Sequence, residues 1–178
     1  MRKSIYPMLA AALSLAPIAS STPAHAQTYP AVVVLTLTAA HSGKCLDVAG
    51  KSAANGADLV QATCDGSPSQ KFTAVRTEAS YEPIYRYETF SGKCLDSGSG
   101  AVQFPLKQQT CNGGWSQKFH TTILHSFDRG VSFLTMESGR ITDKCWHVKD
   151  ASLNDGAPVI VHKCNYPGAG VRNDLFTL

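Results

Sequence analysis

Six cysteines are the residues whose spacing most clearly indicates chemistry in this chain. The first members of three pairs lie 49 and 51 residues apart, and each is followed by a second cysteine 17 or 19 residues later. No C-x-x-C pair is present, and His162 beside Cys164 has no partners at metal-ligand spacing, so we expect no metal site. An even number of cysteines in an oxidising compartment favours disulfides. The repeated spacing predicts the disulfides Cys45–Cys64, Cys94–Cys111 and Cys145–Cys164.

These cysteine pairs belong to a threefold internal repeat. The sequence SGKCLD at 42–47 recurs unchanged at 91–96, and a weaker copy, DKCWH, lies at 143–147. Each second cysteine is followed by an amide or acid and then a phenylalanine, in QKF, QKF and DLF. Features that recur in one order indicate units that bury a shared core together. We name these units repeats 1, 2 and 3, after the first, second and third cysteine pair.

Short strands are the elements that must position these residues. The mature sequence has no sustained 3.6-residue period, so we expect little helix and an all-β fold of about twelve strands, four in each repeat of roughly 50 residues. Phe72, Phe119 and Phe176 should occupy equivalent places in the common core. The expected strands of repeat 1 are 29–38, 44–48, 59–64 and 71–76, and later ones are 85–90, 119–125, 131–136 and 159–164. Residues 138–142 should lengthen the turn before Cys145.

The N-terminus has the pattern of a secretory signal peptide. Arg2 and Lys3 give a positive start, an apolar stretch occupies 8–18, and AHA at 24–26 offers small residues for cleavage. The apolar stretch is too short to span a bilayer of about 30 Å. We therefore expect residues 1–26 to be removed and the protein to be secreted, either outside the cell or into a periplasm.

The mature chain, residues 27–178, is expected to form one domain. Loss of Arg2 and Lys3 leaves 14 basic and 13 acidic residues, and the basic ones form no stripe. A nucleic-acid partner is therefore not expected, because phosphates need a concentrated basic face. The chain has no G-x-S-x-G, H-E-x-x-H or Gly-rich phosphate loop, so we expect neither catalysis nor a cofactor. Any enzyme that it serves should be a separate chain.

The repeated pattern resembles that of the ricin B-type (R-type) lectins across nearly the whole mature region. The shared features are an aspartate two residues after the first cysteine, a loop with Asn-Gly, a second cysteine and a Q-x-W-like element, here Q-x-F or D-x-F. The resemblance implies a pseudo-threefold β-trefoil with up to three shallow sugar sites. In such a site a carboxylate accepts hydrogen bonds from two neighbouring hydroxyls, an aromatic ring stacks on the sugar and an amide donates.

The resemblance assigns candidate site residues in each repeat, but completes no site. The carbohydrate-binding candidates that it implies are Asp47, Gln70, Asp96, Gln117, His162 and Asn173. Aromatic platforms are missing, because Ala62 and Gln109 stand two residues before the second cysteines of repeats 1 and 2. In repeat 3, His147 replaces the acid and Asp174 replaces the glutamine, while His162 takes the platform position.

Each candidate has an alternative role. Asp47 and Asp96 could be turn acids bonded to backbone amides, His147 and His162 could be surface histidines without a ligand, and Gln70 and Gln117 could be buried amides that satisfy backbone groups. An exposed Trp115 could supply the platform that repeat 2 lacks, and Trp146 could be core.

Two functions therefore stay open at this point. The first is a secreted module that binds glycans or glycoconjugates, of galactose type by resemblance. Multiple weak sites would then compensate for one another through effective concentration. The second is a trefoil with decayed sugar sites whose surface binds a protein partner, as in a toxin-delivery subunit or an inhibitor.

Overall fold

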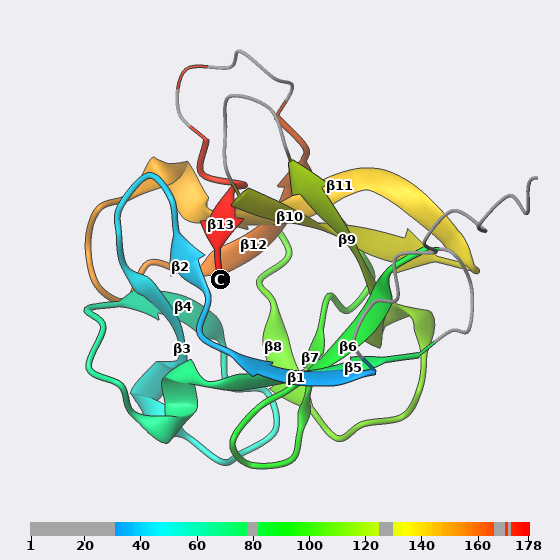
Figure 1. Ribbon diagram of the computed structural model, residues 1–178, viewed down its shortest axis with the longest axis horizontal. Coiled ribbons are helices and arrows are strands. Elements are labelled where there is room, and N and C mark those ends of the chain that lie inside the picture. The colour runs from blue at the N-terminus through cyan, green and yellow to red at the C-terminus, as the bar shows by residue number, and fades with distance from the viewer. Residues whose placement is uncertain (1–30, 78–81, 125–129, 166–169, 171) are drawn as a thin grey trace, which may run out of the picture.

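The computed structural model describes residues 31–77, 82–124, 130–165, 170 and 172–178. The expected signal peptide and the start of the expected strand 29–38 lie outside the described residues. Thirteen strands and four 3₁₀ turns make up the described part, which contains no α-helix (Figure 1). The all-β prediction is therefore confirmed. No helix in this part of the chain is long and apolar enough to cross a membrane.

A barrel is formed by the first and last strands of the three repeats. Hydrogen bonding joins them in the order β1-β5-β6-β9-β10-β13-β2, and β1 and β2 are successive segments of one extended stretch, so the order closes on itself. All of these pairings are antiparallel. The barrel strands are β1 (Val32–Leu35), β2 (Thr38–Ala39), β5 (Phe72–Arg76), β6 (Ile84–Glu88), β9 (Phe119–Leu124), β10 (Gly130–Glu137) and β13 (Phe176–Thr177).

The middle strands of each repeat form a hairpin, and isolated bridges join the three hairpins to one another. The hairpins are β3 (Cys45–Val48) with β4 (Leu59–Ala62), β7 (Cys94–Asp96) with β8 (Lys107–Gln109), and β11 (Arg140–Val148) with β12 (Val159–Lys163). Each first cysteine lies opposite the residue two before the second cysteine. All three predicted disulfides are confirmed, each with a Cα–Cα distance of 5.0 Å.

Equivalent aromatic side chains fill the core, as the repeat predicts. Phe72, Phe119 and Phe176 are fully buried and begin the strands β5, β9 and β13. Trp146, which the sequence left undecided, is also fully buried, with its ring centroid 4.8 Å from that of Phe119. The apolar face that one repeat could not bury alone is therefore shared by all three.

The structure corrects the prediction in two places. Residues 138–142 do not lengthen a turn: the chain reverses at Ser138 and Gly139, and β11 already begins at Arg140. The positive φ angles of these two residues, 48° and 80°, make the reversal tight. The expected entry strand is divided into β1 and β2, so the described residues contain thirteen strands, in agreement with the expected four per repeat and about twelve in all.

Candidate functional site

Each repeat buries one polar side chain at the same place in its hairpin. Asp47 in β3, Asp96 in β7 and His147 in β11 all stand two residues after the first cysteine, and they are 5%, 8% and 3% exposed. A residue two positions along a strand faces the same side as the cysteine. Burial of an acid requires hydrogen-bond partners. Repeats 1 and 2 share one such partner, whereas repeat 3 has a histidine in place of the acid.

In repeats 1 and 2 a buried glutamine orients the acid. The side-chain nitrogen of Gln70 donates to Asp47 Oδ2 at 3.1 Å, and that of Gln117 donates to Asp96 Oδ2 at 3.0 Å. Both glutamines end a 3₁₀ turn, η2 (Pro68–Gln70) or η3 (Trp115–Gln117), and both are 1% exposed.

The same side-chain amides also bind the backbone on both sides of each second cysteine. Gln70 donates to the Thr63 carbonyl and accepts from the amides of Asp65 and Gly66. Gln117 donates to the Thr110 carbonyl and accepts from the amide of Asn112. Their amide groups therefore hold the acid and the backbone in place.

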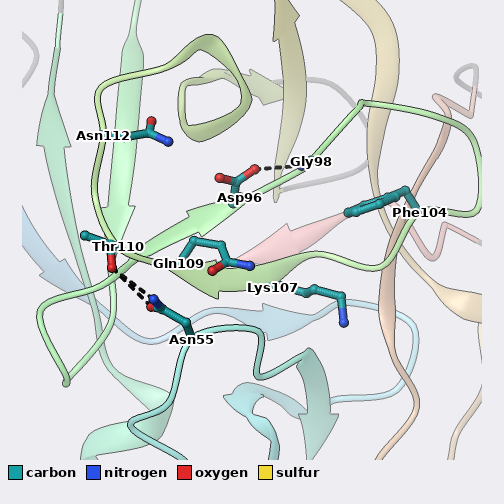
Figure 2. Close-up of a pocket in the computed structure, with 8 residues that line it drawn as sticks. All are labelled: Asn55, Asp96, Gly98, Phe104, Lys107, Gln109, Thr110 and Asn112. Atoms are coloured by element: carbon teal, nitrogen blue, oxygen red, sulfur yellow. Dashed lines mark hydrogen bonds between the residues drawn. The ribbon is translucent and has the colours of Figure 1, made fainter.

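Repeat 2 has an open hollow beside its acid. The hollow measures about 430 Å³ and Asp96 forms part of its wall. The second carboxylate oxygen, Oδ1, accepts a hydrogen bond from the amide of Gly98 at 2.7 Å. The lining residues, drawn in Figure 2, are Asn55, Asp96, Gly98, Phe104, Lys107, Gln109, Thr110 and Asn112.

An aromatic ring does line this hollow, but it comes from an unexpected position. Gln109 occupies the expected platform position, whereas the ring belongs to Phe104 in the β7–β8 loop. Figure 2 shows Phe104 and Asn112 on either side of Asp96. A Cβ atom at Gly98 would lie 2.3 Å from two ring carbons of Phe104, so only glycine permits this approach. The Phe104 carbonyl is also bonded to the amide of Val161, which ties the loop to repeat 3.

The other polar groups of the hollow include an available donor. Asn112 Oδ1 accepts from the amide of Gly114 at 2.7 Å, and its side-chain nitrogen donates to no group of the described residues. Asn55, which comes from repeat 1, is bonded to the Thr110 hydroxyl, and Lys107 is paired with Asp58 at 2.7 Å. The hollow therefore offers a carboxylate, a ring and an amide donor around one space.

Repeat 1 has the same sequence motif but different surroundings. Asp47 Oδ1 is buried and has no hydrogen-bond partner among the described residues, because the amide of Ala49 donates to the Asp58 carbonyl instead. Lys51 Nζ lies 2.8 Å from Asp65 Oδ2, and Asp65 takes the place that Asn112 has in repeat 2. The Lys51 and Ser67 hydrogen bonds hold the pKa of Asp65 well below its usual range. An ion pair thus replaces the free amide donor.

In repeat 3 an acid stands at the position of the glutamine, and a histidine stands at the position of the acid. Asp174 accepts from the amide of Asn165 at 2.9 Å, which is the bond that the glutamines make in the other repeats, and from Arg172 Nε at 3.1 Å. His147 Nε2 is buried and has no hydrogen-bond partner in the part of the chain that the structure describes. The ring centroids of His147 and His162 lie 5.2 Å apart. Burial lowers the pKa of His147, although attraction to Asp174 opposes the shift.

Of the predicted candidates, only Asp96 lines the hollow. Gln117 lies behind it, and Asp47 with Gln70 forms the equivalent pair of repeat 1. His162 stacks edge-on against His147 in repeat 3. Asn173 donates to the Val148 carbonyl at 2.8 Å. The candidates of each repeat therefore lie within that repeat, and the structure does not bring the six residues together in one site.

Among the lining residues that the sequence pattern did not single out are Asn55, Phe104 and Asn112, which bring two amides and the ring to the hollow. Asn112 directly follows a second cysteine, so the repeat alignment could have found it. Asn55 comes from the neighbouring repeat, and Phe104 stands where repeats 1 and 3 have Ala57 and Ala157, so the repeat gives no signal for an aromatic ring there. Trp115 is 41% exposed but lines a different hollow. A cluster of Glu88 with Cys94 and Cys111 has metal-like spacing, but the cysteines are bonded to each other.

Comparisons with known proteins agree with this architecture. The family model of the ricin-type beta-trefoil lectin domain matches residues 33–168. A search of curated proteins found no match. The designed threefold symmetric protein ThreeFoil is 28% identical with a TM-score of 0.69, and the match covers 81% of this chain and 96% of that one.

Two natural proteins of similar structure differ in how much of them this chain spans. An exo-beta-1,3-galactanase from Clostridium thermocellum is 28% identical with a TM-score of 0.66; the match covers 80% of this chain and 29% of the galactanase. A ricin B-like lectin from Macrolepiota procera, in complex with lactose, is 14% identical with a TM-score of 0.66, and the match covers 85% and 96% of the two chains. At that identity the likeness concerns the fold.

Proposed function

Because this chain belongs to the ricin-type beta-trefoil lectin family, we propose that it is a secreted carbohydrate-binding module whose sugar site is the hollow beside Asp96. Carbohydrate binding is a property of the family, and the family is generally not catalytic. The observation that carries the proposal is the convergence of Asp96, Phe104 and Asn112 on one open space. We extend the family property to this chain as a non-catalytic binder.

The chemistry of the hollow suits a pyranose. Each oxygen of Asp96 accepts one protein hydrogen bond and keeps a free lone pair, so two neighbouring sugar hydroxyls can donate to the carboxylate. The Phe104 ring offers an apolar face to the C–H groups of the sugar. Asn112 can donate to a hydroxyl oxygen. Gln117 acts as a positioning residue, because its amide is already bonded to protein groups.

A galactose-type ligand is the first candidate. The similar lectin from Macrolepiota procera was solved with lactose, which carries a terminal galactose. At the position of Asn112, repeat 1 has Asp65, which is paired with Lys51. At the position of Asp96, repeat 3 has His147 in place of a carboxylate. Asp47 and His162 are therefore weaker candidates for sugar contact, and we propose one principal site.

Retention on galactose-agarose tests this proposal directly. The protein should be retarded, and Asp96→Asn should lower its affinity by about tenfold to a hundredfold, because a hydrogen bond to a charged group contributes about 1.5–3 kcal/mol. Asp47→Asn is the matched control, since it makes the same change in the same hexapeptide, and it should retain nearly full affinity. Absence of retention at high ligand density, together with no binding on a glycan array, would refute the proposal.

Secretion is part of the same proposal. Three disulfides suit an oxidising compartment, and residues 1–26 have the pattern of a signal peptide. Mass spectrometry of the protein exported by its source should find a chain that starts at Gln27. A chain that retains residues 1–26 would contradict this.

A protein-binding trefoil is the second candidate function. It is favoured by repeats 1 and 3, where the protein's own groups, Lys51 with Asp65 and Asp174 with Arg172, pair with each other at the positions of sugar-binding groups. A pull-down from the secretome of the source discriminates between the two. A stoichiometric protein partner that free galactose does not displace would favour this second function.

A further inference from the structure

A second hollow lies between repeats 2 and 3, next to the proposed sugar site. It measures about 210 Å³. One wall is formed by Trp115 and Ser116 with the backbone of the 98–100 loop, and the other by the end of β10 and the start of β11. Gly98 borders both hollows. Gly98 itself adds no side chain to the divide between them, and the Phe104 ring packs against it.

Trp115 is held in a fixed position at this hollow. The ring lies against the β10–β11 turn, where a Cβ atom at Gly139 would be 3.3 Å from ring carbon Cζ2. Lys118 Nζ lies 4.2 Å from the ring centroid. The indole nevertheless remains 41% exposed. A ring that is already immobilised loses little conformational entropy when a ligand packs against it.

Acceptors and donors for hydroxyl groups flank this ring. Glu137 is exposed, and its carboxylate is paired with no other described residue. The Thr135 and Thr142 hydroxyls lie 2.7 Å apart, and Lys144 Nζ donates to the Gly100 carbonyl at 2.9 Å. An aromatic side chain and a carboxylate thus border this hollow, as Phe104 and Asp96 border the first.

We propose that the two hollows form one extended site for a neutral oligosaccharide. The terminal sugar occupies the hollow beside Asp96, the chain passes over Gly98, and the next sugar packs against Trp115 with its hydroxyls near Glu137. This inference rests on the proposed function, and it adds that the preferred ligand is longer than one sugar. Because the second sugar adds contacts without a second association event, affinity should rise with chain length.

Tryptophan fluorescence provides the test. The chain has two tryptophans, and Trp146 is fully buried, so acrylamide quenching reports mainly on Trp115. The probes are galactose and galactose-terminated disaccharides with β-1,3, β-1,4 and β-1,6 linkages, titrated by calorimetry and quenching. At least one disaccharide should bind about tenfold more tightly than galactose, the effect of one aromatic stacking contact. That disaccharide, but not galactose, should protect Trp115 from acrylamide.

Variants separate the second hollow from the first. Trp115→Ala should reduce disaccharide affinity to that of galactose and leave galactose affinity unchanged, while Trp115→Phe should retain most of the gain. The unchanged emission of Trp146 verifies folding in both variants. If galactose binds but no disaccharide binds more tightly, or if Trp115→Ala affects both sugars equally, the extended site is refuted and the proposed function stands. If neither galactose nor any disaccharide binds, both fail.

Discussion

Replacement of Gln117 by leucine should destabilise the fold more than its small change in volume suggests. Gln117 donates to Asp96 Oδ2 and to the Thr110 carbonyl, both at 3.0 Å, and accepts from the Asn112 amide at 2.8 Å. Leucine removes all three bonds and leaves their partners without compensation. A buried polar group that loses its partner costs about 1–3 kcal/mol. Three such partners would sum to about 3–9 kcal/mol. Because the bonds to Thr110 and Asn112 are only partly buried, we expect the free energy of unfolding to fall by about 3–6 kcal/mol.

Urea unfolding, followed by circular dichroism with the disulfides intact, measures this loss. Gln109→Leu is the matched control, because it makes the same change at the last residue of β8. There the glutamine side chain has no hydrogen bond within the described residues. The control should stay within about 0.5 kcal/mol of the parent. A loss below about 1 kcal/mol in Gln117→Leu, or an equal loss in both variants, would refute the positioning role assigned to this amide.

Three further predictions concern pH, the Gly98 turn and the disulfides. Burial lowers the pKa of His147, so the unfolded chain binds a proton at this side chain at a higher pH than the folded chain does. The free energy of unfolding should therefore fall as the pH drops below about 6.5. Urea unfolding at pH 7.5 and 5.5 should show a smaller fall in His147→Gln than in the parent protein. Gly98→Ala should weaken galactose binding and lower stability more than Gly43→Ala does. Both glycines have a positive φ, but only Gly98 contacts Phe104. Equal effects of the two substitutions in calorimetry would contradict this. Alanine in place of both cysteines of any one disulfide should cost about 3 kcal/mol in urea unfolding, and an unchanged midpoint would be the contrary result.

The periodic part of the structure could be predicted from the sequence. Each repeat makes the same hairpin and contributes to the same core, so the cysteines, the Q-x-F elements and their phenylalanines recur. The core positions of Phe72, Phe119 and Phe176 could therefore be assigned together. Ser138 and Gly139 were harder, because the length of a turn depends on backbone angles that the repeat pattern does not record. The strand β11 therefore begins earlier than expected.

The site depended on features that do not recur. Asp47 and Asp96 lie in identical hexapeptides, yet only Asp96 borders the hollow. The loop of repeat 2 is two residues shorter, and its Gly98 amide donates to Asp96, whereas the Ala49 amide of repeat 1 does not donate to Asp47. The counterparts of Phe104 in repeats 1 and 3 are alanines, Ala57 and Ala157, so its ring occurs once. Its approach requires the missing Cβ of Gly98. A comparison between repeats cannot find groups that occur once.

A crystal structure of the protein soaked with galactose tests the central claim most directly. The account predicts sugar density in the hollow of repeat 2, with two ring hydroxyls within hydrogen-bonding distance of Asp96, the apolar face on Phe104 and Asn112 at a third hydroxyl. Density beside Asp47 or His162 with none beside Asp96, or no density at saturating galactose, would contradict it.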